Sequence, residues 1–282
     1  MRAADLRSPF HGVRVAGAVH DARSLALAFR PRIRGDWAIG AESAAAIEGL
    51  PLPYRCAAAQ QVQIAVPRGS NRPVGRNVRA RIVRPDLFST VLVDGMPLTA
   101  PALTWCMIAP RATKEELVRL GDALVSVNRS YVGRRAGFVP LSLEDLALAV
   151  KCWARCDGVA NLRAALPWIR TGAASPPESD LRMQLIAAGL PEPEINVDVH
   201  DDRGNWLARV DALFRQERLV FEYEGDGHRT DRRQFRRDIR RGGGLEDAGY
   251  RVMRVTGDDI YRHVGDFRRR ARQVFERRRR SC

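Results

Sequence analysis

Lysine is almost missing from this 282-residue sequence. Only Lys114 and Lys151 are lysines among the 47 Lys and Arg residues, so arginine carries nearly all of the positive charge. The sequence also lacks the uninterrupted apolar run of about 18 residues that a membrane-spanning helix needs. Its start contains Arg2, Asp5 and Arg7, where a signal peptide has an apolar core. These absences predict a cytoplasmic protein that is neither exported nor inserted into a membrane.

Cysteine is also scarce, with five residues and no Cys-x-x-Cys spacing. An odd number without paired spacing excludes a disulfide scaffold and predicts reduced thiols. Cys152 and Cys156 lie one helical turn apart, but no second pair of ligands with suitable spacing accompanies them. We therefore expect buried thiols there rather than a zinc site.

The charge that is present is strongly positive and unevenly placed. The net charge is +14, which favours a polyanionic partner. Residues 175–261 are an exception, with 14 basic and 18 acidic residues, and basic stretches flank them on both sides. A metal-dependent enzyme acting on nucleic acid needs this distribution, because carboxylates hold cations while arginines hold phosphates. The alternative interpretation is that acidic and basic residues are distributed over the surface without a functional role.

A connector rich in Gly, Ser and Pro at 171–177 predicts a domain break near Gly172. The apolar spacing before it indicates an α+β region over 1–171, with Asp94-Gly95 as a hairpin turn. The elements expected there are a helix at 42–49, strands at 62–67, 78–84, 89–93 and 96–99, and helices at 102–108, 114–125, 143–155 and 159–169.

After the break, residues 172–282 alternate between helix and strand patterns, which predicts an α/β domain with a mixed sheet flanked by helices. The elements expected are a helix at 178–188, strands at 195–199, 207–214 and 219–224, a basic helix at 231–248, a strand at 250–255 and a terminal helix from 258.

Two of these strands form an acidic hairpin around the polar loop at 215–218. If Phe214 lies opposite Leu219, Asp211 lies opposite Glu222, and Glu224 shares the face of Glu222. Three carboxylates this close are costly unless a divalent cation neutralises them. The pattern therefore predicts a metal site with Asp211, Glu222 and Glu224 as ligands. The alternative is a structural ion-pair network of the same acids with Arg209 and Arg254.

An Asp followed on the next strand by Glu-x-Glu resembles the acidic core of the PD-(D/E)XK nucleases, which have a restriction-endonuclease-like fold. The stretch from Ser175 to about Arg277 resembles the very-short-patch-repair (Vsr)-like endonuclease domains. The segments that carry this likeness are 175–182, 209–211, 221–230, 237–241, 245–250 and 252–256.

The resemblance implies roles for individual residues, with Mg2+ or Mn2+ as cofactor. Asp211 would be the principal metal ligand and Glu222 or Glu224 a second one, while Glu178 would offer a carboxylate from the first helix. The family's Lys is replaced by Glu224, so water activation falls to His228 or to the metal. The basic helix would bring Asp238 to the same cleft. The arginines that would contact DNA are Arg229, Arg232, Arg233, Arg237 and Arg240.

Two of these residues also have simpler interpretations. Glu178 would favour the N-terminus of a helix, where a negative charge is stabilised. His228 follows a Gly-Asp-Gly turn and could be a solvated loop residue. The tail from Arg277 to Arg280 fits a solvated helix end as well as a DNA contact.

The upstream region resembles, more loosely, the AbiEi-type antitoxin region that precedes such nuclease domains. The likeness rests on residues 8–15, 41–53 and 95–106. No clear winged helix opens the sequence. The resemblance implies DNA as a partner and a second partner protein of toxin-antitoxin type.

These observations together predict a metal-dependent DNA endonuclease that hydrolyses phosphodiesters. The runner-up is a non-catalytic, antitoxin-like DNA-binding regulator that keeps the nuclease fold. A third hypothesis is a protein-interaction module with nonspecific affinity for DNA, which would bind no metal.

Overall fold

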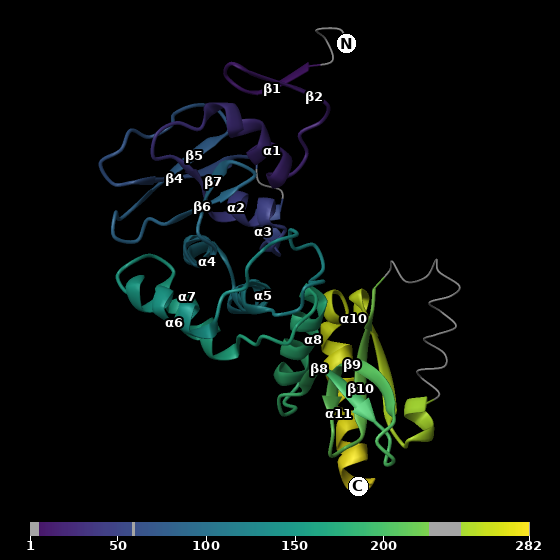
Figure 1. Cartoon of the computed structure of the whole chain (residues 1–282). Coiled ribbons are helices and arrows are strands. Elements are labelled where there is room, and N and C mark those ends of the chain that lie inside the picture. The colour runs from purple at the N-terminus through teal and green to yellow at the C-terminus, as the bar shows by residue number, and fades with distance from the viewer. Residues whose placement is uncertain (1–5, 58–59, 226–243, 282) are drawn as a thin grey trace. The chain divides into compact units, whose positions relative to one another are not determined.

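The computed structural model describes residues 6–57, 60–225 and 244–281, and the chain divides into two compact units, Met1–Thr171 and Gly172–Cys282 (Figure 1). The division lies in the Gly/Ser/Pro connector of the sequence. The architecture is mixed α/β, with several sheets and helices. Each unit has its own hydrophobic core.

The first unit contains a five-stranded sheet with the strand order β5-β4-β3-β7-β6, and a separate two-stranded ribbon. The pairs β4/β5 and β3/β7 are parallel and the others are antiparallel. The strands are β1 (Leu6–Phe10), β2 (Val13–Ala16), β3 (Ala38–Ile39), β4 (Val62–Pro67), β5 (Val78–Val83), β6 (Thr90–Val93) and β7 (Met96–Thr99).

The Asp94-Gly95 turn shows why the sequence folds this way locally. Both residues have positive φ, 50° and 74°, as the two central residues of a type I′ turn require. Val93 pairs with Met96 directly across this turn. The predicted hairpin is confirmed.

Helices α1 and α2 pack on one face of the five-stranded sheet, against apolar residues of β3, β4 and β7. Helix α2 is capped at its C-terminus by Gly49, which has a left-handed φ of 68° that suits glycine. The N–H of Gly49 donates to the carbonyls of Ala45 and Ala46 at the end of the helix. The helices of this unit are α1 (Ala22–Phe29), α2 (Ala41–Glu48), α3 (Tyr54–Ala57), α4 (Pro101–Ile108), α5 (Lys114–Val125), α6 (Leu143–Cys152) and α7 (Val159–Ala165).

A buried acid with two arginines lies where α2 meets this sheet. Glu42 is 1% exposed, and its Oε1 lies 2.9 Å from Nη1 of Arg111 and 3.7 Å from Nη2 of Arg81. Burial raises the pKa of the Cys56 thiol to about 11, so the thiol stays protonated, and its Sγ donates to the same Oε1 across 3.5 Å. Arg81 also donates to Gln63. Glu42 is therefore the common acceptor of the group.

The prediction of buried thiols on α6 is wrong for Cys152, which is exposed, whereas Cys156 is half-buried. The physical reason is the orientation of α6. Leu146 and Val150 form its buried side, one turn apart, and Cys152 lies on a different side.

The second unit contains a four-stranded mixed sheet with the order β11-β10-β9-β8. The pair β10/β11 is parallel, and β9 pairs antiparallel with both β10 and β8. The elements are α8 (Pro176–Ala187), β8 (Glu194–His200), β9 (Trp206–Phe214), β10 (Leu219–Glu224), β11 (Arg251–Thr256), α10 (Gly257–Tyr261) and α11 (Val264–Ser281).

Apolar clusters lie on both sides of this sheet. One side packs against α8, α10 and α11 (Figure 1). The cluster on this side includes Phe221 of β10 and Phe267 of α11. The other side holds Val220 and Leu245. Residues 244–247 are helical and residue 248 lies in the turn that follows, whereas residues 231–243 of the expected basic helix lie outside the described residues.

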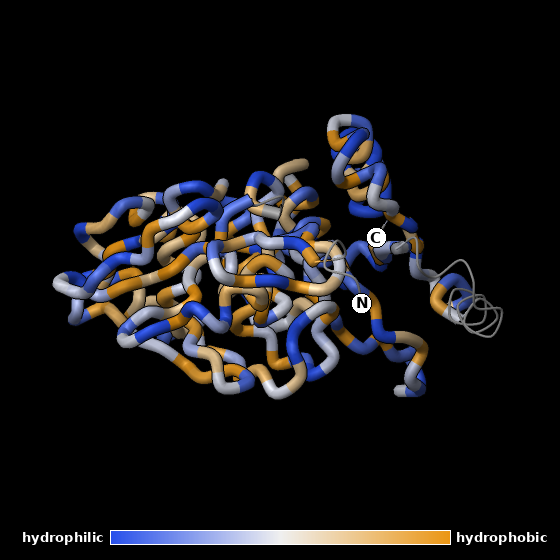
Figure 2. Tube along the Cα trace, turned by 90° about the horizontal axis from the view of Figure 1, so that it is seen from above, coloured by the Kyte–Doolittle hydropathy of each residue, from blue (hydrophilic) through white to orange (hydrophobic). Residues whose placement is uncertain are grey.

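Hydrophobic and hydrophilic residues interleave along the trace (Figure 2). Within residues 6–57, 60–225 and 244–281, no helix combines the length and apolar character needed to cross a bilayer.

Candidate functional site

The acidic hairpin has the predicted register. Leu219 pairs with Phe214, Val220 with Leu213 and Phe221 with Ala212. The next position along these strands places Asp211 beside Glu222. Both acids are half-buried.

Strand β9 reverses its faces at Asp211. Ala212 packs on the side of α8 and α11, whereas Val210, which has the same parity, packs on the side of Leu245. A regular strand would place both on one face, because successive side chains alternate. The register of β8 on β9 places Asn196 opposite Asp211, and Asn196 has a φ of +50°. The irregularity therefore involves both strands at the same point.

The carboxylate of Asp211 is fixed against β10 at this irregularity. Its Oδ2 accepts the backbone N–H of Tyr223 at 2.7 Å. The backbone ladder of β9 and β10 ends at Phe221, so the Asp211 side chain continues the connection between the two strands. Asp211 is thereby held next to Glu222, the residue that precedes Tyr223.

Arg254 of β11 is a neighbour of both glutamates of β10. Arg254 is the register partner of Glu222, and its Nη1 donates to Oε1 of Glu224 at 2.8 Å. The Glu224 and Arg254 side chains are 48% and 55% exposed, so the pair contributes at most about 1 kcal/mol. Arg209 instead lies 4.0 Å from Asp198. The alternative ion-pair network is therefore present for the pair Glu224 and Arg254.

Glu178 lies in the first turn of α8 and holds the loop before that helix. Its Oε2 accepts the N–H of Ala174 and its Oε1 accepts the hydroxyl of Ser175, both at 2.7 Å. Oε2 also accepts the side-chain amide of Asn196. The expected position at a helix N-terminus is confirmed. The same carboxylate is linked, through Asn196, to the point where Asp211 lies.

Asn196 is the site residue that sequence reasoning missed. A signal was present only in the residue type, because asparagine tolerates the left-handed region better than most residues. Its amide connects α8 to β8 directly across from Asp211. It is therefore a positioning residue in this arrangement.

We expect Asn196→Ala to lower the free energy of unfolding by about 1–3 kcal/mol, since alanine loses the hydrogen bond to Glu178 and is strained at positive φ. Asn196→Gly loses the hydrogen bond without the strain, so it should cost less than the alanine variant. Urea unfolding of both variants measures the difference. Equal stability of the wild type and Asn196→Ala would contradict the role assigned to this amide.

The part of the chain that the structure describes contains no group of three or more His, Cys, Asp and Glu side chains placed to hold a metal ion. Two of the three predicted ligands, Asp211 and Glu222, lie beside one another. The third, Glu224, accepts a hydrogen bond from Arg254 instead. His228 and Asp238 lie outside the described residues. So do the predicted DNA contacts, which are Arg229, Arg232, Arg233, Arg237 and Arg240.

Two curated proteins of Mycobacterium tuberculosis are similar to this chain. They are "Uncharacterized protein MT2308" of strain CDC 1551 / Oshkosh and "Uncharacterized protein Rv2248" of strain ATCC 25618 / H37Rv. Each is 30% identical over 185 residues, which are 66% of this chain and 64% of the relative. The chain thus spans less than two thirds of the length of the curated relatives it matches. No family model matches the sequence, and no solved structure matches it significantly.

Proposed function

We propose that residues 172–282 form a metal-dependent DNA endonuclease of the Vsr-like PD-(D/E)XK type, which hydrolyses phosphodiesters in the cytoplasm. The observation that carries the proposal is the position of Asp211. Its carboxylate is held against β10 beside Glu222, at a point where two strands leave their regular geometry. Irregular strand geometry that re-aims a side chain is often found beside active sites.

The donor set fits Mg2+ better than a softer metal. Carboxylate oxygens are the ligands that Mg2+ prefers, and it is commonly held by one or two carboxylates together with substrate phosphates. Asp211 and Glu222 are such a pair. When bound, the ion would polarise the scissile phosphate and lower the pKa of an attacking water.

The chain's own residues would position this chemistry. The N–H of Tyr223 orients the Asp211 carboxylate, and Arg254 keeps Glu224 turned toward β11. Arg254 is 55% exposed and would attract the phosphate backbone to the same face. In this proposal His228 transfers the proton, and the arginines of the basic segment after Glu224 contact DNA.

The runner-up is a non-catalytic, antitoxin-like regulator that keeps the nuclease fold. Two observations favour it. Glu224 is engaged by Arg254, and the described residues form no three-ligand group. In this case Met1–Thr171 would be the antitoxin-like region and would contact a partner protein of toxin-antitoxin type.

The deciding experiment is cleavage of supercoiled plasmid and of mismatched duplexes by the purified full chain in Mg2+ or Mn2+, with an EDTA control. The endonuclease predicts metal-dependent nicking. Tight DNA binding without nicking in either metal would favour the regulator.

DNA binding itself should weaken steeply with salt. Each phosphate contact contributes about −0.9 to the slope of log affinity against log salt concentration, so four contacts give about −3.6. With a net charge of +14, we expect a slope at least this steep. Fluorescence anisotropy with a labelled duplex, titrated between low and physiological salt, measures it. An affinity that does not change over this range would contradict a nucleic-acid partner.

A further inference from the structure

Helix α11 has an unusual concentration of arginine. Eight of its 18 residues are arginines, against the acids Asp266 and Glu276. Its apolar side is buried, since Phe267, Ala271 and Phe275 pack into the core of the second unit. The arginines of α11 therefore fall into two groups, those that hold the helix against the rest of the unit and those that face outward.

Three arginines are tied to the body of the unit. Arg278 donates from Nε to the carbonyl of Glu217 and from Nη2 to that of Gly249, both at 2.9 Å. Arg268 donates to Gln184 of α8, and Arg270 pairs with Asp259. These side chains hold α11 in place.

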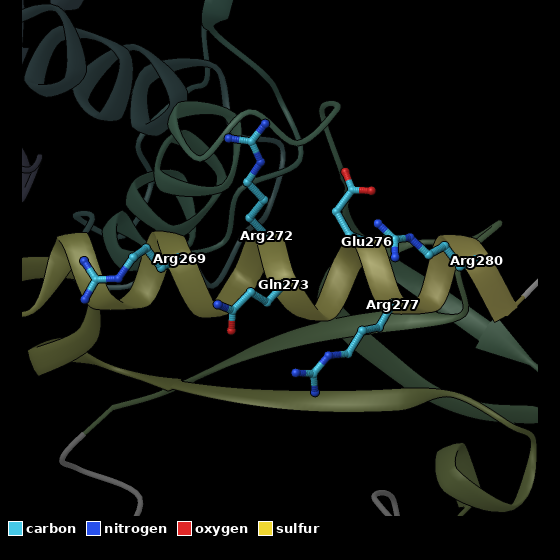
Figure 3. A pocket seen from close by; sticks show the side chains of 6 residues that line it. All are labelled: Arg269, Arg272, Gln273, Glu276, Arg277 and Arg280. Carbon is cyan, nitrogen blue, oxygen red and sulfur yellow. The ribbon is translucent and has the colours of Figure 1, made fainter.

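A different side of the helix presents arginines outward. Six residues spaced three and four apart line an open hollow of about 390 Å3, and their side chains project from the helix in Figure 3. They are Arg269, Arg272, Gln273, Glu276, Arg277 and Arg280. We call the four arginines of this set the arginine face.

Most of this face is not neutralised. Arg269 pairs with Asp266, whereas Arg272, Arg277 and Arg280 are exposed and make no ion pair with the described residues. Three guanidinium groups repel one another and gain from an anion between them. The surface therefore suits a ligand with a row of negative charges.

We propose that the arginine face binds the sugar-phosphate backbone of duplex DNA, as a site separate from Asp211 and Glu222. Arg280 lies eleven positions after Arg269, which is about 16 Å along the helix. A duplex carries one negative charge per about 1.7 Å, or roughly ten charges over that length. The row of arginines thus has a ligand of matching charge along its whole length.

An anionic membrane surface is the competing partner, and the packing of α11 argues against it. A basic amphipathic helix binds membranes by burying its apolar side among the lipids. Here that side is already buried against α8 and the sheet. Only the positive charge of the arginine face remains available for binding, and these arginines form a row along the helix.

The two sites lie on different sides of β10. Helix α11 packs on the side of Leu219 and Phe221, whereas Val220 lies on the other side, and the strand alternation places Glu222 with Val220. DNA on the arginine face would therefore not rest on the acidic pair. The inference stands whether or not the chain is a nuclease.

The test replaces Arg272, Arg277 and Arg280 together by glutamine and measures duplex binding in EDTA. A matched control replaces Arg34, Arg68 and Arg129, three exposed arginines of the first unit, by glutamine, which removes the same charge. We expect the α11 variant to bind at least about tenfold more weakly near 100 mM salt, with a salt slope shallower by about 3. The control variant should lose much less of its affinity for the duplex.

Several outcomes would overturn the proposal. An unchanged slope in the α11 variant, or an equal loss in the control, would show that the face is not a DNA site. Loss of binding to anionic vesicles with DNA binding intact would assign the face to membranes. A version with lysine at the three positions should bind DNA nearly as well as the wild type. If the glutamine variant fails to fold by circular dichroism, Arg280→Gln alone should lower the slope by about 1.

Discussion

Asp211→Asn is expected to lower metal-dependent cleavage by at least about 100-fold while duplex binding in EDTA stays within a few-fold of the wild type. Asparagine keeps an oxygen that can accept the N–H of Tyr223, so the strand geometry should survive. It removes one of the two carboxylate charges for the metal, and a catalytic metal contributes several kcal/mol to the transition state. Nicking rates and anisotropy on the same preparations separate the two effects.

A matched control is Asp202→Asn, which makes the same chemical change at a fully exposed acid paired with Arg218. It should cleave like the wild type. Equal activity of Asp211→Asn and Asp202→Asn would remove the catalytic role of Asp211 and indicate a contaminating nuclease. If all three proteins bind but do not cleave, the regulator becomes the better proposal.

The largest expected effect on stability is that of Glu42→Gln in the first unit. Glutamine has nearly the shape of glutamate but leaves Arg81 and Arg111 without the buried charge that they share. Breaking a buried ion pair on one side costs about 3 kcal/mol or more. For a unit of this size we expect the midpoint of thermal unfolding to fall by roughly 6–12 °C.

Glu144→Gln provides the comparison, because Glu144 also lies in the first turn of a helix, α6, but is exposed. It should lose only the favourable interaction with the helix dipole, less than about 1 kcal/mol. Calorimetry of both variants measures the contrast. If the two substitutions are equally mild, Glu42 does not hold the arginines in the way described.

The sequence predicted the acidic hairpin well because two independent signals agreed there. A four-residue polar loop limited the register of Phe214 and Leu219, and alternation gave the faces of β10. The same alternation failed on β9. It assumes regular strands, and the reversal at Asp211 lies opposite the positive φ of Asn196, which is 15 residues away in the sequence and meets Asp211 only when β8 and β9 pair.

Short elements were missed for a related reason. Strand β3 has two residues, Ala38 and Ile39, and such a length shows no periodicity. It is a strand because β4 and β7 lie on either side of it. Likewise, the spacing of arginines on α11 did not separate Arg278, which binds two carbonyls, from its neighbour Arg277, which is exposed. That distinction depends on the loops that the helix packs against.

The opposite sides of β10 have a consequence for how such a chain can diverge. One side supports the helix that carries the arginine face, and the other side carries the acidic pair. Substitutions on one side leave the packing of the other side in place. A lineage could therefore lose the proposed metal ligands by drift while selection still maintains the proposed DNA binding through α11. In that case, a single substitution at Asp211 would convert the proposed nuclease into the proposed regulator.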